Sequence, residues 1–65
     1  MERRNWLKEL RKEKGFTVRD IAKELGISFS HYSGIENGVK NPSLPLALKI
    51  SNFFKFKVED FVIRP

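Results

Sequence analysis

Small polar side chains that can form hydrogen bonds gather between residues 28 and 37. This stretch contains five of them: Ser28, Ser30, His31, Ser33 and Asn37. On an α-helix, at about 100° per residue, Ser30 and Asn37 lie opposite Tyr32, and His31 and Ser33 flank them. Their hydroxyl, imidazole and amide groups donate and accept hydrogen bonds, as base edges in the major groove do. The pattern therefore predicts a helix whose small polar face suits the major groove of DNA.

The same residues do not form a catalytic or metal-binding set. His31 is the only histidine and cysteine is absent, so a metal ion would lack a second nitrogen or sulfur ligand. No obvious nucleophile or carboxylate partner accompanies His31, and no glycine-rich loop could hold a phosphate. We therefore expect a protein that is not an enzyme and that binds no cofactor, metal or small-molecule ligand.

Two short helices joined by a glycine turn are expected to position these side chains. Residues 17–20, Thr-Val-Arg-Asp, fit the capping-box pattern, with aspartate in place of the commoner glutamate. Gly26 is the expected left-handed residue after this helix. Ser28 is expected to cap the next helix. Together these signals predict a helix-turn-helix unit at about residues 17–37.

Three further helices are expected around this unit. The first runs from an N-cap at Asn5 to about residue 14, with Trp6 in its apolar stripe. A strongly apolar helix follows the cap residue Ser43 and should be the central, most buried one. A short fifth helix is expected at residues 59–62, followed by a tail or a short edge strand at residues 63–65. The chain is therefore expected to form one compact all-α domain of five helices, residues 1–65.

The composition restricts the class of protein further. Sixty-five residues make one small domain, and without cysteine neither disulfides nor thiolate metal sites can reinforce it. Such a composition suits a reducing cytoplasm. No apolar run has the length of a signal segment or a membrane span, so no membrane partner is expected.

The formal net charge of +5 is distributed unevenly along the chain. Residues 1–14 contain six basic and three acidic side chains, residues 15–38 two and three, and residues 39–65 five and two. Positive charge therefore flanks the helix-turn-helix unit. This pattern fits either an ordinary solvated surface or contacts with DNA phosphates. The candidates for phosphate contacts beside the unit are Arg19, Lys40 and Asn41.

Several short motifs in register resemble the Cro/C1-type helix-turn-helix domains, the Xre family of phage repressors and bacterial regulators. The resemblance covers nearly the whole chain and rests on Arg11, Gly15, Thr17, Ile21-Ala22, Gly26-Ile27-Ser28, Tyr32-Ser33, Ile35-Glu36-Asn37-Gly38 and Asn41-Pro42-Ser43-Leu44. It looks most like short regulators of Gram-positive bacteria and their prophages. The chain departs from the family at Val18, where glutamine is frequent, and at Gly34, where a long polar residue is frequent.

The resemblance implies a lambda-repressor-like fold, an ion pair between Arg11 and Glu36, and entry of the third helix into the major groove. The candidates for groove contact are Ser28, Phe29, Ser30, His31 and Ser33. Further candidates for contact with the DNA backbone are Thr17 and Asn37. Phe29 either covers the edge of the domain or contacts a thymine methyl group. Because this helix lacks arginine and glutamine, we expect affinity to depend on phosphate contacts and DNA shape.

Two classes of function fit these residues. The first is a sequence-specific regulator of transcription that binds double-stranded DNA, a repressor that acts as a homodimer on an operator with two half-sites. Its dimer surface should come from Phe61, Val62 and Ile63. The alternative is a protein-binding module, such as an antitoxin or anti-repressor, that uses Phe29, Gly34 and the apolar C-terminal residues.

Overall fold

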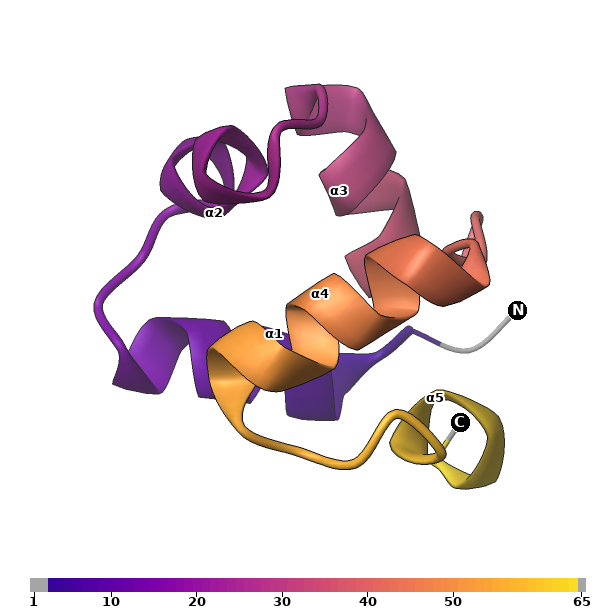
Figure 1. Ribbon diagram of the computed structural model, residues 1–65. Helices are drawn as coiled ribbons and strands as arrows, with labels where there is room; N and C mark the ends of the chain where they lie inside the picture. Colours follow the sequence, from indigo (N-terminus) through magenta and orange to yellow (C-terminus); the bar gives the residue numbers. More distant parts are fainter. Residues whose placement is uncertain (1–2, 65) are drawn as a thin grey trace.

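Five α-helices make up the computed structural model, which describes residues 3–64 (Figure 1). They are α1 (Asn5–Glu13), α2 (Val18–Leu25), α3 (Phe29–Glu36), α4 (Leu44–Phe54) and α5 (Asp60–Ile63). No strand occurs within residues 3–64, so Ile63 belongs to a helix and not to an edge strand, and residue 65 lies outside the described part. The predicted all-α fold of five helices is confirmed.

Three helices begin at the hydroxyl residues that the sequence indicated. The Thr17 hydroxyl accepts a hydrogen bond from the Asp20 amide, and the Asp20 carboxylate accepts one from the Thr17 amide, both at 3.1 Å. This is the predicted capping box with aspartate as its acidic member. The hydroxyl groups of Ser28 and Ser43 cap α3 and α4 by accepting hydrogen bonds from amides three residues further on.

The start of α1 was predicted wrongly. Asn5 is the first residue of the helix, the N-cap is Arg4, and no side chain caps this end. The Arg4 carbonyl accepts hydrogen bonds from the amides of Leu7 and Lys8, while the Arg4 amide donates to the Glu36 carbonyl at 2.7 Å. A contact between distant parts of the chain therefore sets the start of α1, where the sequence suggested a local side-chain cap.

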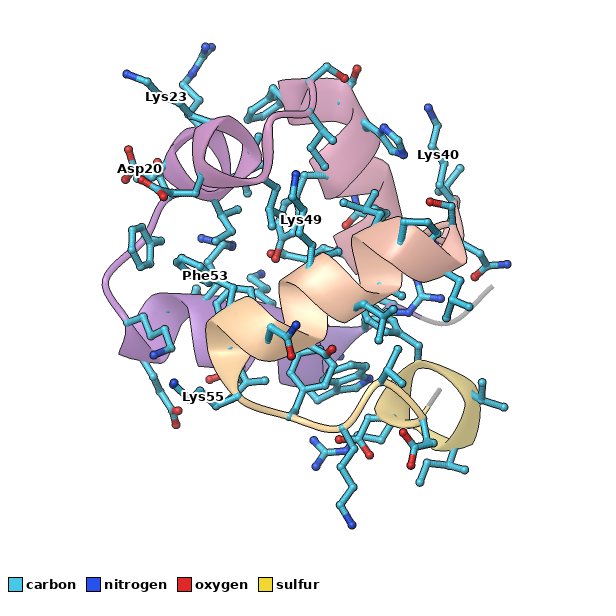
Figure 2. The ribbon with its side chains drawn as sticks, in the orientation of Figure 1. Asp20, Lys23, Lys40, Lys49, Phe53 and Lys55 are labelled. Atoms are coloured by element: carbon cyan, nitrogen blue, oxygen red, sulfur yellow. The ribbon has the colours of Figure 1, made fainter. Side chains whose placement is uncertain are left out.

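A left-handed glycine turns the chain between α2 and α3. Gly26 has a φ of 72°, and its amide donates back to the Lys23 carbonyl, while the Ile27 amide donates to the Ala22 carbonyl. Residues with a Cβ atom adopt this conformation at a cost of roughly 1–2 kcal/mol. Lys49 of α4 supports the same end of α2 by donating to the Leu25 carbonyl at 3.3 Å (Figure 2). The short turn therefore holds α3 at a defined angle to α2.

The core lies where α1, α2, α3 and α4 meet. Its largest fully buried side chains are Tyr32, Leu7, Ile21, Ile35 and Ile50. α4 crosses the middle of the molecule, in front of α1 and below α2 and α3 in the view of Figure 1. The prediction of a central, strongly buried helix is confirmed for one face of α4. Its other side is accessible, since Leu44 and Leu48 are exposed.

An aromatic cluster attaches α5 to α1. Trp6 packs against Phe56 and Phe61 with ring centroids 5.1 and 5.6 Å apart, and Phe56 and Phe61 are 5.5 Å apart. The rings meet edge to face, which contributes about 0.5–1.5 kcal/mol per pair beyond the apolar area buried. α5 begins at Asp60, one residue after the predicted start. Within residues 3–64, no helix is long and apolar enough to cross a lipid bilayer.

Candidate nucleic-acid interface

α3 has one buried side and one accessible side, as its sequence predicted. Tyr32 and Ile35 are fully buried, and Glu36 is 7% exposed. The predicted groove residues are exposed or half-buried: Ser28, Phe29, Ser30, His31 and Ser33. The core therefore fixes the helix by one side and leaves its first turn available to a ligand.

The first turn of α3 is also favourable for an anion. It contains no acidic side chain, and the Ser28 hydroxyl accepts a hydrogen bond from the His31 amide at 3.1 Å. The amides of Phe29 and Ser30 lie in the first turn, where the helix has no carbonyl to accept their hydrogen bonds. They can therefore bind a phosphate oxygen. At the start of α2, by contrast, the Asp20 carboxylate already accepts a hydrogen bond from the Thr17 amide and places a negative charge in the first turn. Hydrogen bonds from Thr17 lower the pKa of that carboxyl. Electrostatically, the start of α3 is the better phosphate site.

Arg19 of α2 and Phe29 of α3 meet on this accessible side. The Arg19 guanidinium carbon lies 5.2 Å from the centroid of the Phe29 ring, and both residues are exposed. A cation–π contact of this kind contributes about 0.5–1 kcal/mol at an exposed site. The sequence predicted both residues as DNA contacts, but it contained no signal that they touch each other.

Lys40 extends from the loop between α3 and α4 along the surface of α3 (Figure 2). A Cβ atom added at Gly34 would lie 3.1 Å from the Lys40 Cγ atom, and the Gly34 carbonyl accepts hydrogen bonds from the amides of Val39 and Lys40. The absence of a side chain at Gly34 therefore makes room for the lysine stem.

Arg4 positions that loop, a role that its place in the sequence did not indicate. Its Nη1 donates to the carbonyls of Ile35 at 2.6 Å and Lys40 at 3.1 Å, and its Nη2 donates to the Asn41 Oδ1 at 2.6 Å. The guanidinium also lies 5.5 Å from the centroid of the Phe61 ring. Burial lowers the pKa of Arg4. The sequence offered only a basic residue directly before the first apolar stripe, because its partners lie more than thirty residues away.

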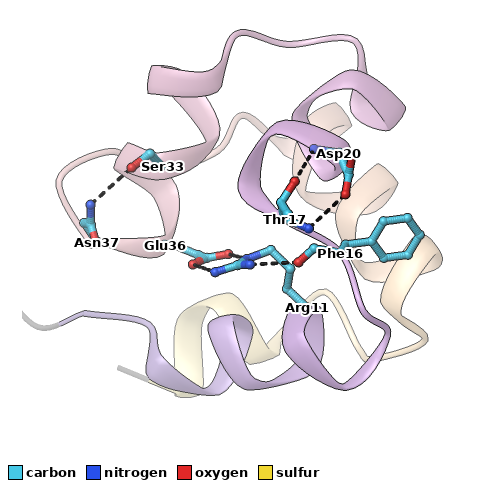
Figure 3. Close-up of polar contacts among 7 residues, drawn as sticks. All are labelled: Arg11, Phe16, Thr17, Asp20, Ser33, Glu36 and Asn37. Carbon is cyan, nitrogen blue, oxygen red and sulfur yellow. Dashed lines mark hydrogen bonds and ion pairs between the residues drawn. The ribbon is translucent and has the colours of Figure 1, made fainter.

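The predicted contact residue Asn41 is therefore oriented by Arg4. Its side-chain oxygen is occupied by the guanidinium, which leaves the amide NH₂ group as the donor for an external acceptor. Asn37 and Ser33, two further candidates, interact with each other, since the Asn37 Nδ2 donates to the Ser33 Oγ at 3.3 Å (Figure 3).

Arg11 and Glu36 form a buried ion pair between α1 and the end of α3 (Figure 3). The Arg11 Nε lies 2.6 Å from the Glu36 Oε2, and the Arg11 Nη2 lies 3.2 Å from the Glu36 Oε1. The Arg11 Nη1 also donates to the Phe16 carbonyl at 2.8 Å. The hydrogen bond to Glu36 raises the pKa of Arg11. The structure thus brings together the two residues that the resemblance implied as partners.

Apolar side chains surround a second accessible region, on the α5 side of the molecule. A groove of about 510 Å³ is lined by Arg4, Asn41, Pro42, Leu44, Ala47, Val58, Glu59, Phe61 and Val62. Val62 is 87% and Ile63 72% exposed, whereas Phe61 is half-buried in the aromatic cluster. The three predicted dimer residues therefore lie together, with Val62 and Ile63 facing solvent. Within residues 3–64, no three His, Cys, Asp or Glu side chains are grouped as a metal site would require.

Comparison with known proteins agrees with this geometry. The family model for the helix-turn-helix domain matches residues 7–61. An uncharacterized HTH-type transcriptional regulator of Methanocaldococcus jannaschii is 45% identical over 60 residues, which cover 92% of this chain and 91% of that protein. The uncharacterized HTH-type transcriptional regulator YqaF of Bacillus subtilis is 43% identical over 53 residues, which cover 82% of this chain and 70% of YqaF. An uncharacterized HTH-type transcriptional regulator of Archaeoglobus fulgidus is 37% identical over 60 residues, which cover 92% of this chain and 86% of that protein.

The matched residues include α2, α3 and α4 completely, together with most of α1. They contain the turn at Gly26, the accessible first turn of α3 and the Arg11–Glu36 pair. The chain belongs to the Cro/C1-type helix-turn-helix family.

Proposed function

We propose that this protein is a sequence-specific regulator of transcription that binds double-stranded DNA through α3. The observation that carries this proposal is the fixed orientation of α3, with Tyr32 in the core and an accessible first turn. Arg19 on one side and Lys40 on the other provide positive charge. The family is one of DNA-binding regulators and not a class of enzymes, and the relatives named above support the same function.

The contacts divide into two groups. Ser30, His31 and Ser33 face the base edges as adaptable donors and acceptors, and Phe29 provides an apolar contact. The remaining candidates contact the phosphate backbone and set the position of α3 in the groove. They are Thr17, Arg19, Ser28, Asn37, Lys40 and Asn41. This division makes phosphate contacts the larger contribution to affinity, because no long side chain of α3 forms a bidentate pair with a base.

A salt titration tests the proposal. If Arg19 and Lys40 of two protomers each neutralise a phosphate, the slope of log affinity against log salt concentration is about −3.6. The affinity should then fall about 150-fold between 50 and 200 mM salt. A duplex selected from a random pool serves as the ligand and also gives the half-site sequence and spacing. Affinity that does not change with salt would contradict DNA binding by these cations.

A charge placed on α3 tests which surface meets the DNA. We expect Ser30→Glu to abolish operator binding, because a carboxylate in the first turn of α3 repels phosphates and the acceptor edges of bases. The control is Asn52→Glu, which adds the same charge at an exposed position of α4 and should leave binding nearly unchanged. Equal binding by Ser30→Glu and the unsubstituted protein, with circular dichroism showing both folded, would refute the assignment.

We further propose that the protein represses transcription as a homodimer in the cytoplasm. One domain contacts few base pairs, so two copies on half-sites about one helical turn apart provide the required selectivity. Val62 and Ile63, with the edge of Phe61, support a dimer surface on α5 because they are apolar and adjacent. Sedimentation of the protein with and without operator DNA measures the stoichiometry, and a reporter gene under the operator measures the direction of regulation.

The apolar groove beside α5 favours one second candidate, a module that binds another protein, as an antitoxin or anti-repressor does. The exposed Leu44 and Val62 at this groove would then contact that protein. The same salt titration distinguishes the two functions. A protein-binding module shows no affinity for duplex DNA above background at any salt concentration.

A further inference from the structure

We propose that Phe29 contacts the C5-methyl group of a thymine, so that each half-site of the operator has an A·T pair at the position facing the first turn of α3. This inference rests on the proposed DNA-binding function. It adds the kind of base pair that the protein selects and the chemical group by which it does so.

Phe29 stands apart from the other phenylalanines of the chain. Each of the other five packs edge to face against another aromatic ring: Phe16, Phe53, Phe54, Phe56 and Phe61. Phe29 is 48% exposed, and the ring contact found for it among residues 3–64 is with a guanidinium group. The domain therefore does not use this ring to complete its core.

Arg19 contacts the Phe29 ring while its own charge stays available. The guanidinium carbon lies 5.2 Å from the centroid of the Phe29 ring, and Phe29 is still 48% exposed beside this contact. A guanidinium group keeps its N–H donors around its edge for a phosphate oxygen. Arg19 can thus bind a DNA phosphate while Phe29 contacts a base, and the contact between them restricts the motion of both side chains.

Only one base offers an apolar group in the major groove. Thymine presents its C5-methyl group there beside the O4 acceptor, whereas the other three bases present donors or acceptors without a methyl group, and a phenyl ring cannot satisfy these polar groups. A ring placed against them would leave polar groups desolvated without a partner. Phe29 consequently favours thymine, because its ring contacts the methyl group. It disfavours the other bases, because its ring would remove water from their polar groups without replacing the lost hydrogen bonds.

The test removes the methyl group and nothing else. In the operator selected from a random pool, each thymine is replaced in turn by uracil, which keeps every hydrogen-bonding group. Fluorescence anisotropy then measures the affinity of the unsubstituted protein for each duplex. We expect one uracil position per half-site to weaken binding about fourfold, the value that corresponds to one buried methyl group. The other uracil positions should have smaller effects.

A matched substitution assigns the effect to the ring. In Phe29→Ala the overall affinity should fall, and the thymine and uracil duplexes should bind equally well. Leu48→Ala removes a similarly exposed apolar side chain from α4 and should keep the fourfold preference. If operator DNA binds but no thymine shows the effect, or if Phe29→Ala keeps it, the inference is wrong and DNA binding stands. If no duplex is selected at all, both proposals fail.

Discussion

Replacing Glu36 by alanine should strongly destabilise the domain, because it leaves Arg11 buried without its partner. The two side chains are 10% and 7% exposed, and two hydrogen bonds of 2.6 and 3.2 Å join them. After the substitution, the guanidinium keeps the Phe16 carbonyl as an acceptor, which satisfies one of its N–H groups. The remaining donors face a part of the interior from which water is largely excluded.

The magnitude follows from the burial of the pair. Removing one member of a buried ion pair costs about 3–5 kcal/mol. A domain of this length has a free energy of unfolding of about 3–10 kcal/mol. The melting temperature should therefore fall by at least about 12 °C, and Glu36→Ala can approach complete unfolding at room temperature. Glu36→Gln retains one acceptor for the Arg11 Nε and should cost less, about 1–3 kcal/mol.

Urea and thermal unfolding, followed by circular dichroism, measure these changes. The control is the double substitution Arg11→Met with Glu36→Leu, which removes both charges and keeps apolar volume. We expect this variant to be more stable than Glu36→Ala, because the desolvation of both charges is avoided, and less stable than the unsubstituted protein, because the Phe16 carbonyl loses its donor. A melting curve of Glu36→Ala that matches the unsubstituted protein would refute the reasoning, and so would a double variant less stable than Glu36→Ala.

Three further predictions concern other contacts. Hydrogen bonds from Thr17 lower the pKa of Asp20 in the folded state. The Asp20 carboxylate therefore stabilises the domain fully at a pH above its pKa in the unfolded chain, about 3.9. This contribution is lost as the pH falls through the lower pKa of the folded state. Asp20→Asn should flatten that pH dependence in urea titrations. Gly34→Ala should weaken operator binding by displacing Lys40. Its gain in helix propensity, about 1 kcal/mol, should raise the melting temperature by less than the corresponding 4–8 °C, because moving the Lys40 stem offsets part of the gain. Arg4→Met should cost about 3 kcal/mol, because the carbonyls that Arg4 satisfies lose their donor.

Each of these has a result that contradicts it. An Asp20→Asn variant with the same acid sensitivity as the unsubstituted protein would mean that the capping carboxylate is not the group that titrates. Undiminished operator binding by Gly34→Ala would show that the position of Lys40 is unimportant. Arg4→Lys is the control for Arg4→Met, since it keeps the charge but not the three-acceptor geometry. Full stability of Arg4→Met would remove the assigned role.

Local patterns predicted the helices well. The caps at Thr17, Ser28 and Ser43 depend on a hydroxyl group and an amide three residues apart, so a sequence motif contains all of the required information. The left-handed Gly26 and the buried side of α3 follow from equally local signals. The predicted N-cap at Asn5 was wrong, because a tertiary hydrogen bond from the Arg4 amide to the Glu36 carbonyl sets the start of α1.

The contacts that shape the candidate interface were not predictable in this way. Arg4 reaches acceptors 31 to 37 residues away, and the pairing of Arg19 with Phe29 depends on the angle between two helices. Lys40 lies against Gly34 because the loop folds back on α3. Such contacts arise from packing. The resemblance to a family could indicate Arg11 and Glu36 as partners, but it contained no counterpart for these contacts.

The aromatic cluster at α5 provides the chain with an intrinsic optical probe. Trp6 is the only tryptophan, its indole touches Phe56 and Phe61, and the Arg64 guanidinium lies 5.2 Å from its ring. A four-residue helix with no fully buried side chain is the first element expected to detach on mild heating. Indole emission therefore responds to the departure of this helix before the main transition, and association of two copies through the same helix should shift it without any attached dye.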